Sequence, residues 1–347
     1  MDVSVVIPVK NGMPYLKECL ESLLQQNFDG KWEICMYNDG STDSTITYAE
    51  SFIPQFQERN IDLRIRSGAE SGGVGFAKNQ AVKMSTGRFI CFCDADDVSE
   101  LSRLQEQYNM AISRKSDLVF IGSNFTRLPE GSTERYTKWA NELTTAQLTV
   151  QVYTSHGPTL IAPTWFISRK LFFVVGGFRD DLRSGFPEDL DFFYRALDVD
   201  DVAFAKVYEP LVKYRYHPGC ASFGVSEAAI WNMRVSRFCS HVLPFWKTFT
   251  IWNAGKQGKR FFKSLSESDK QRVVSFCDVD VKKIKRAWLE DYDEKARVVR
   301  WKLPIVHVKS ARPPVVICVK LDMTGGDLER LVAESQWEEG RDYVYFS

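Results

Sequence analysis

The sequence lacks any long hydrophobic run. Its longest apolar clusters, near residues 117–122 and 314–319, have the length of a strand and are far too short to cross a bilayer. The first residues, MDVSVVIPVKNG, carry an acid at position two and only a brief apolar segment, which is unlike a secretory signal. We therefore expect no membrane association and a cytoplasmic location.

The eight cysteines contain no CxxC pair, which removes support for a zinc ribbon. Four of them lie inside apolar, strand-like runs (Cys35, Cys91, Cys93 and Cys318), where a reduced thiol packs as a small hydrophobic group. The cysteines thus favour a protein in a reducing compartment over a secreted protein with disulfide bonds.

The chain has no excess of either charge, with 45 basic and 45 acidic residues, but the charge is unevenly distributed. Residues 246–320 hold 18 lysines and arginines against 8 aspartates and glutamates. A basic segment is often only a solvated surface, yet it is also what binding to a polyanion requires. The length of 347 residues favours two domains.

Apolar strand-like segments alternate with helical patterns in the first part of the chain. VSVVIPV (3–9), WEICMYNDGSTD (32–43), IDLRIRSG (61–68) and RFICFC (88–93) are the strand candidates. This alternation predicts an α/β fold with a mainly parallel sheet. Ligands of such sheets bind beyond the carboxyl ends of the strands. Asp39 and the acids after the fourth strand should therefore face one crevice.

Three carboxylates, Asp94, Asp96 and Asp97, follow the fourth strand directly. In an extended Asp-x-Asp segment, Asp94 and Asp96 point to the same side, where their oxygens can share a hard divalent cation. The alternative is an Asp-rich turn that caps a helix starting near Ser99. The buried strand before the acids and the presence of Asp39 at a neighbouring strand end favour the metal site.

The segment FPEDLDFFYR (186–195) begins an amphipathic helix, with Glu188 and Asp189 in its first turn. Carboxylates are common at helix N-termini for electrostatic reasons alone. In an enzyme, one of them could instead act as a general base toward an acceptor hydroxyl.

Four stretches in order, VSVVIPVKN, YNDGSTD, GVGFAKNQAVKMSTGRFICFCDADD and FPEDLDFFYR, resemble family 2 glycosyltransferases with the GT-A fold, over roughly residues 3–220. The resemblance implies an inverting, metal-dependent enzyme with a nucleotide-sugar donor and Mn²⁺ or Mg²⁺ as cofactor. It makes Asp189 the general base, with Glu188 orienting it, and assigns Asp94 and Asp96 to the metal. The residues that it implies for donor binding are Pro8, Val9, Asn11, Asp39, Lys78 and Asp94. Asn38 departs from the family pattern, which commonly has Asp there, and Lys78 replaces the commoner Arg.

KYRYHPGCAS (213–222) contains His217, one of only four histidines. A lone histidine is more often structural than a ligand. In many enzymes of this fold, however, a late loop supplies a histidine to the metal site, so the resemblance implies His217 as a metal ligand and Arg215 as a diphosphate contact.

The last third predicts a small Rossmann-like α/β domain at residues 246–347, after a first domain at residues 1–245. IWNAGKQGKRFFKSL supplies the glycine turn and a basic helix, and VVSFCDVD the second strand. Asn253 replaces the first glycine of the dinucleotide fingerprint, which argues against NAD binding. A role in structure or in RNA contact is the better interpretation.

Further stretches, including STERYTKWANELT, SHGPTLIAPTWF, FTIWNAGKQGKRF and ARPPVVICVKLDMTGG, resemble one group within the family over nearly the whole chain. This group, described as β-1,3-N-acetylglucosaminyltransferase-like, includes the queuosine-tRNA galactosyltransferase of animals. The resemblance implies UDP-galactose as donor and queuosine of tRNA-Tyr as acceptor, with no obligate protein partner. N-acetylglucosamine or another hexose, with a glycan, lipid or protein acceptor, stays open, as does an inactive RNA-binding scaffold. The expected acceptor contacts are Trp165, Arg135, Tyr136, Lys256, Lys259 and Arg260.

Overall fold

The computed structural model describes residues 1–154, 157–181, 185–293 and 295–347. The chain forms two compact units. The first contains Met1–Thr149 and Gly157–Ile230, and the second contains Val150–His156 and Trp231–Ser347. The division falls inside helix α9 (Glu227–His241) and not at the expected boundary after residue 245. Residues 150–154 also pack in the second unit, a long-range relation that has no local sequence signal.

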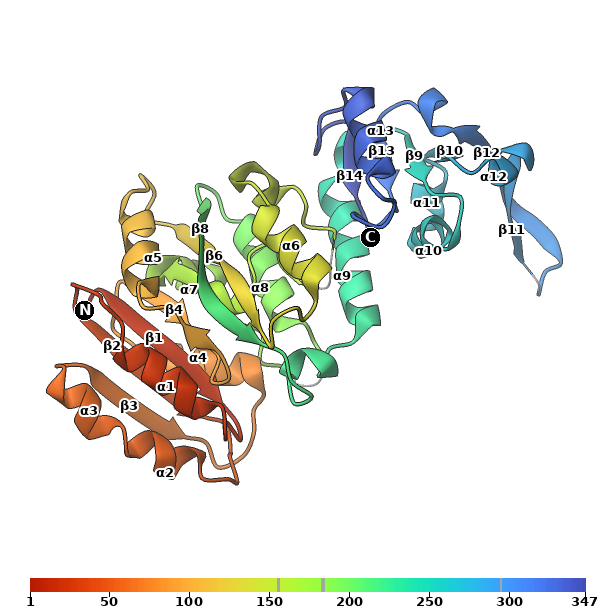
Figure 1. The fold of residues 1–347 in the computed structure, drawn as a ribbon. Helices are drawn as coiled ribbons and strands as arrows, with labels where there is room; N and C mark the ends of the chain where they lie inside the picture. The colour runs from red at the N-terminus through yellow and green to blue at the C-terminus, as the bar shows by residue number, and fades with distance from the viewer. Residues whose placement is uncertain (155–156, 182–184, 294) are drawn as a thin grey trace. The chain divides into compact units, whose positions relative to one another are not determined.

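The first unit is built on an eight-stranded sheet of order β3-β2-β1-β4-β7-β6-β8-β5 (Figure 1). Strands β1 to β4 run parallel, and β7 runs antiparallel to both of its neighbours. The strands are β1 (Val3–Val9), β2 (Trp32–Asn38), β3 (Asp62–Ser67), β4 (Phe89–Phe92), β5 (Val98–Ser99), β6 (Val119–Leu128), β7 (Phe166–Ser168) and β8 (Ala203–Arg215). The sheet is therefore mixed, and its parallel part is the one predicted from the alternating pattern.

Helices connect the strands and cover the sheet. They are α1 (Leu16–Leu24), α2 (Thr45–Glu50), α3 (Ile53–Glu58), α4 (Val74–Met84), α5 (Arg103–Ile112), α6 (Glu134–Glu142), α7 (Arg169–Val175) and α8 (Glu188–Leu197), with short 3-10 turns η1 (Thr145–Thr149), η2 (Ala162–Thr164) and η3 (Ala221–Gly224). Among the described residues, no helix combines the length and the apolar character that crossing a membrane requires.

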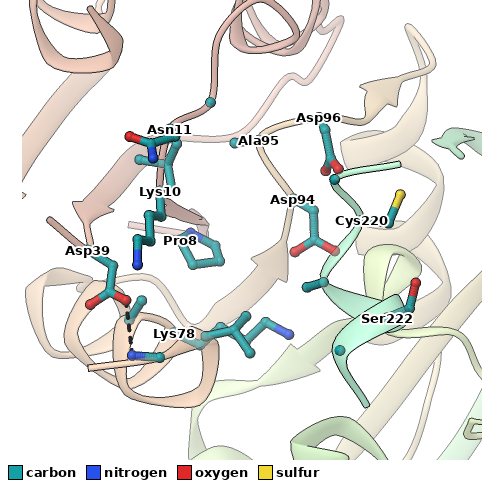
Figure 2. Close-up of a pocket in the computed structure, with 18 of the residues that line it drawn as sticks. Pro8, Lys10, Asn11, Asp39, Lys78, Asp94, Ala95, Asp96, Cys220 and Ser222 are labelled. Carbon is teal, nitrogen blue, oxygen red and sulfur yellow. Dashed lines mark hydrogen bonds between the residues drawn. The ribbon is translucent and has the colours of Figure 1, made fainter. Parts of the chain in front are cut away.

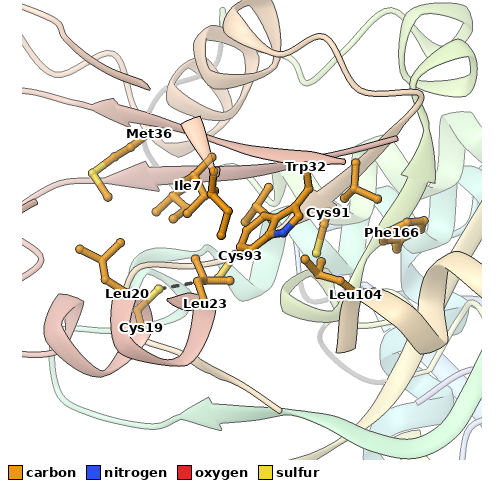
Figure 3. Close-up of a cluster of buried hydrophobic side chains, with 14 of the residues drawn as sticks. Ile7, Cys19, Leu20, Leu23, Trp32, Met36, Cys91, Cys93, Leu104 and Phe166 are labelled. Atoms are coloured by element: carbon orange, nitrogen blue, oxygen red, sulfur yellow. Dashed lines mark hydrogen bonds between the residues drawn. The ribbon is translucent and has the colours of Figure 1, made fainter. Parts of the chain in front are cut away.

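The main core of the first unit lies between α1 and the parallel strands (Figure 3). Leu20 and Leu23 of α1 pack with Ile7, Trp32 and Met36 from the sheet. All seven positions of β1 are buried, as expected for a strand that is covered on both faces. The hydrophobic sequence of β1 thus reflects its central place between β2 and β4.

The register of the parallel strands brings their carboxyl ends together. Val9 of β1 pairs with Asn38 of β2, so both strands end at the same level. The backbone N–H of Cys93, directly after β4, donates to the carbonyl of Val6 at 3.1 Å. The segments that follow β1, β2 and β4 therefore emerge at one edge of the sheet.

The second unit contains a six-stranded sheet of order β11-β12-β10-β9-β13-β14. All strands are parallel except β11, which forms an antiparallel pair with β12. The elements are β9 (Phe249–Trp252), α10 (Lys256–Ser264), α11 (Glu267–Lys270), β10 (Val273–Asp278), α12 (Val281–Lys285), β11 (Trp288–Asp293), β12 (Val298–His307), β13 (Val315–Ile317), α13 (Asp327–Ser335) and β14 (Tyr343–Tyr345), with 3-10 turns η4 (Leu243–Phe245) and η5 (Val308–Ser310). The unit is Rossmann-like, as its sequence pattern predicts.

Asn253 closes the loop where a dinucleotide fingerprint has its first glycine. Its side-chain Oδ1 accepts the N–H of Gly255 at 2.7 Å, and its Nδ2 donates to the carbonyl of Cys318 at 2.8 Å. The side chain thus joins the ends of β9 and β13, where parallel α/β sheets bind their ligands. That the unit does not bind NAD stays a prediction.

Candidate active site

The carboxyl ends of β1, β2 and β4 border a cavity of about 880 Å³ in the first unit. Figure 2 shows Asp94 and Asp96 on one side of this cavity, with Asp39 and Lys10 on the other and Lys78 at its base. Most of the residues predicted for the site line it: Pro8, Val9, Asn11, Asp39, Lys78, Asp94, Asp96, Glu188, Asp189 and His217. Residues from six separate stretches of sequence are therefore assembled around one space.

The wall formed by β1 and β2 is held by side-chain contacts. Asp39 accepts the backbone N–H groups of Gly72 and Gly73 at 2.7 and 3.0 Å and the hydroxyl of Ser71 at 2.6 Å. Asn11 Oδ1 accepts the N–H of Thr42 at 2.8 Å. Gly73 has a φ of +94°, which favours glycine at this position. Asp39 therefore shapes the glycine-rich loop as well as the cavity wall.

The three acids after β4 occupy different environments. Asp94 and Asp96 line the cavity, whereas Asp97 is 1% exposed and accepts the backbone N–H of Arg215 at 2.7 Å. Burial, with the charges of Asp96 and Asp94, raises the pKa of Asp97 well above its ordinary value. Burial also raises the pKa of Asp94, while Lys78 opposes this effect. Only two of the three acids are thus available to a ligand.

Asp96 lies against His217, which follows β8. The Nε2 of His217 is 2.8 Å from Oδ2 of Asp96, and the imidazole packs on the ring of Tyr15 with centroids 4.5 Å apart. The side chains of Asp96 and His217 keep 30% and 16% of their exposure. A carboxylate and an imidazole at this distance, both open to the cavity, can share a divalent cation.

Arg215, the expected diphosphate contact, does not line the cavity. Its Nε donates to the carbonyl of Asp96 at 2.8 Å, and its guanidinium pairs with Glu18 at 2.8 Å and lies over Tyr15. These contacts hold the turn after β4 in place. Arg215 thus positions this turn through Nε, Nη2 and one face of its guanidinium, and its contact with a diphosphate stays a prediction.

Lys78 of α4 is a buried cation in an acidic setting. It is 4% exposed, and its Nζ lies 3.1 Å from Oε1 of Glu188. Burial alone lowers the pKa of a lysine. The charges of Glu188, Asp94 and Asp189 outweigh this effect, and the pKa of Lys78 is raised. Lys78 thus remains charged and joins the acids of α8 to those that follow β4.

Asp189 is in the first turn of α8 and lines the cavity. Burial and the charge of Glu188 raise its pKa to about 7, with Lys78 acting in the opposite direction. Its Oδ1 accepts the N–H of Leu190 at 2.7 Å. A carboxyl group with a pKa close to neutrality can accept a proton near physiological pH, as general-base catalysis requires.

The expected acceptor residues lie in several environments. Trp165 is fully buried, donates to the carbonyl of Leu160 at 2.6 Å and packs among aromatic rings, so it presents no face to an acceptor. Arg135 is exposed on α6, whereas Tyr136 is partly buried against Phe125. The sequence pattern could not show that Trp165 is buried and Tyr136 only partly so, because an aromatic residue suits both a core and a binding surface.

Lys256, Lys259 and Arg260 lie on α10 of the second unit. Lys256 and Lys259 are exposed. The guanidinium of Arg260 instead lies over the ring of Trp231, 3.9 Å from its centroid. The two lysines are therefore the better candidates for contact with a polyanion.

Several residues that line the cavity have no place in the sequence-based prediction, among them Lys10, Tyr15 and Cys220. Lys10 follows β1, Tyr15 supports His217, and Cys220 comes three residues after His217. The donor atoms of Asp96, His217 and Cys220 all lie within 4.8 Å of one another. The sequence signal for Cys220 was its proximity to His217, but the spacing matches no common metal motif.

Comparison with known proteins identifies the fold and shows a similarity to a glycosyltransferase family. Residues 4–174 match the family model described as Glycosyl transferase family 2. An uncharacterized glycosyltransferase of Rickettsia typhi is 29% identical over 312 residues, which are 81% of this chain and 89% of that protein. The poly(ribitol-phosphate) beta-glucosyltransferase of Bacillus spizizenii is 33% identical over 120 residues, 34% of this chain and only 18% of that protein.

Among solved structures, S. aureus TarS superposes with a TM-score of 0.53 and 19% identity, over 77% of this chain and 42% of TarS. TarS 1-349 in complex with UDP-GlcNAc gives a TM-score of 0.52, with 18% identity and coverage of 77% and 71%. The fold is thus GT-A-like, the architecture of nucleotide-sugar transferases. Residues 4–174 of this chain are similar to family 2 glycosyltransferases.

Proposed function

We propose that this chain transfers galactose from UDP-galactose to a hydroxyl of the cyclopentene-diol of queuosine, at the wobble position of tRNA-Tyr, with inversion at the anomeric carbon. The observation that carries the reaction type is the placement of Asp189, with a pKa of about 7, in the same cavity as Asp94 and Asp96. The acceptor rests on the sequence resemblance that spans both units.

The donor is assigned to the wall formed by β1, β2 and β4. Pro8, Val9 and Asn11 contact the nucleobase together with Asp39, and Asp94 contacts the ribose. The complex of TarS 1-349 with UDP-GlcNAc supports a uridine diphosphate donor for this fold. Galactose is preferred here on the sequence resemblance, and N-acetylglucosamine is the alternative sugar.

The cavity suits a divalent cation because its oxygen and nitrogen donors face the same space. Asp96 and His217 would hold it, with Asp94 close by on the same turn. When bound, the cation supplies positive charge to the diphosphate leaving group as negative charge develops there.

The chain's own residues carry the proton transfer. The carboxylate of Asp189 takes the proton of the acceptor hydroxyl while that oxygen forms a bond to the anomeric carbon. The bond from this carbon to the diphosphate oxygen breaks, and UDP leaves from the opposite face. Lys78 holds Glu188 beside Asp189, and this arrangement fixes the start of α8. The product is the galactosylated acceptor, UDP and one proton, which Asp189 returns to solvent.

A second acceptor class is supported by one of the relatives. The poly(ribitol-phosphate) beta-glucosyltransferase of Bacillus spizizenii acts, by its name, on a polyol phosphate polymer. Such a polymer is also a polyanion that presents hydroxyl groups. A hexosyltransferase acting on a glycan of this kind is therefore the alternative, and the response to tRNA discriminates between the two.

Replacing Lys256 and Lys259 with glutamate should weaken tRNA binding by about tenfold or more at low salt, because two phosphate contacts are lost. The slope of log affinity against log salt concentration should become shallower by about two. The measurement is fluorescence anisotropy with tRNA-Tyr over a salt series. The control variant Lys115→Glu/Lys170→Glu, which reverses two exposed charges in the first unit, should bind tRNA as the wild type does. An unchanged affinity in the α10 variant would favour an acceptor other than RNA.

A further inference from the structure

Cys220 lies in the active-site cavity beside the proposed metal ligands, and the proton-transfer chemistry makes no use of it. Asp96 follows β4, His217 follows β8, and Cys220 immediately precedes η3. One carboxylate oxygen, one imidazole nitrogen and the sulfur all lie within 4.8 Å of one another. All three side chains line the cavity. Three different donor types are thus gathered from two strand ends.

A tight turn places the thiol on this side. The backbone N–H of Cys220 donates to the carbonyl of His217 at 3.0 Å, which closes the turn 217–220. The Cys220 sulfur accepts the N–H of His217 at 3.2 Å and lies 3.6 Å from the carbonyl of Arg215. Figure 2 shows Cys220 and Asp96 on the same side of the cavity. The turn therefore places the thiol beside the imidazole at the end of β8, although β7 and β6 separate β8 from β4 in the sheet.

We infer that Cys220 is a third protein ligand of the metal, together with Asp96 and His217. Hard cations such as Mg²⁺ and Ca²⁺ take oxygen ligands, whereas imidazole and thiolate favour transition metals. A site with one oxygen, one nitrogen and one sulfur donor selects Mn²⁺, Co²⁺ or Zn²⁺ over Mg²⁺. The thiol proton passes to solvent as the metal binds, and no oxidant is required. Positions not filled by the protein remain open to diphosphate oxygens.

This inference deepens the proposed function, since the metal lies where the donor diphosphate is assigned. It can nevertheless be tested with neither donor nor acceptor present. The full-length chain is titrated with Co²⁺ without added thiols, and the near-ultraviolet absorption is followed for a thiolate-to-cobalt charge-transfer band. We expect one such site per chain, and we expect excess Mg²⁺ to displace Co²⁺ only poorly.

Cys220→Ser should lose the charge-transfer band and bind Co²⁺ about tenfold or more weakly. Cys239→Ser is the matched control, because Cys239 is similarly half-buried but lies on α9, and this variant should keep the band. Co²⁺ binding without a sulfur band in the wild type, or a band that survives in Cys220→Ser, would overturn the assignment.

A second measurement uses the wild-type chain and so does not depend on the folding of a variant. Iodoacetamide labelling is followed by mass spectrometry with and without Zn²⁺. Zn²⁺ should protect Cys220 and leave the labelling of Cys239 unchanged. Equal labelling of Cys220 under both conditions would contradict the inference. Loss of transfer with the sulfur band intact would instead count against the proposed reaction and leave the metal site standing.

Discussion

Asp189→Asn is expected to reduce kcat for sugar transfer by about 10²- to 10⁴-fold, the usual contribution of a general base. An amide cannot accept the proton that the attacking hydroxyl must lose. Donor binding should remain, since Asp189 is assigned to the acceptor side, and calorimetry with UDP can verify this. Asp191→Asn is the matched control on the same helix. Its carboxylate pairs with Arg195 at 2.7 Å, away from the proposed chemistry, and its rate should stay near that of the wild type.

The raised pKa of Asp189 gives this prediction a pH signature. The base must be deprotonated to act, so kcat/KM should fall about tenfold per pH unit below the pKa of about 7 and level off above it. Asp189→Asn should abolish this acidic limb while the residual rate persists. A wild-type limb near pH 4, or a limb that survives in Asp189→Asn, would assign the base to another group.

Lys78→Met is expected to destabilise the first unit by about 3–5 kcal/mol, the range typical when one partner of a buried ion pair is removed. The loss leaves Glu188 without its cation and places Asp94 and Asp189 in an uncompensated acidic pocket. Chemical denaturation monitored by tryptophan fluorescence measures the effect. Transfer activity should fall with it, because the start of α8 depends on this contact.

Two variants separate charge from packing at Lys78. Lys78→Arg keeps the cation that pairs with Glu188, so most of the stability and activity should be retained. Lys83→Met changes an exposed lysine of the same helix and should alter stability by no more than about 0.5 kcal/mol. If Lys78→Met were as stable as Lys83→Met, the buried ion pair would have no structural importance.

The sequence was sufficient to locate the site because strand ends carry a local signal. Asp39 and the Asp94–Asp96 pair follow apolar strands, and parallel strands bring their carboxyl ends to one edge. Glu188 and Asp189 were recognised by their motif at a helix start. Their convergence on one cavity then follows from the topology, which the alternating pattern of strands and helices predicts.

The sequence could not show how individual side chains are oriented. Arg215 ends β8 and His217 lies two residues further on, yet one side chain pairs with Glu18 and the other with Asp96. Trp165 fits a binding surface as well as a core by composition, and only the packing shows that it is buried. Cys220 joins the site through a turn whose geometry depends on backbone hydrogen bonds, and no pattern of residue types encodes it.

Local sequence patterns likewise do not predict where the chain divides into two units. Residues 150–154 pack in the second unit although they lie in the first part of the chain, and the division falls within the continuous helix α9. The composition shows only where the basic segment 246–320 begins, and this segment begins well after the division in α9. The division depends on contacts between residues that are far apart in the chain. Such contacts cannot be predicted from a short stretch of sequence.

The most direct test of the proposed function is transfer with purified protein, Mn²⁺ and a panel of UDP-sugars, using queuosine-containing tRNA-Tyr as acceptor. The same tRNA lacking queuosine is the control. Mass spectrometry of the digested nucleosides should show a gain of one hexose on queuosine, with UDP-galactose only and with no change in the control. A hexosylated glycan or polyol phosphate, with no product on queuosine from any donor, would contradict the proposed acceptor.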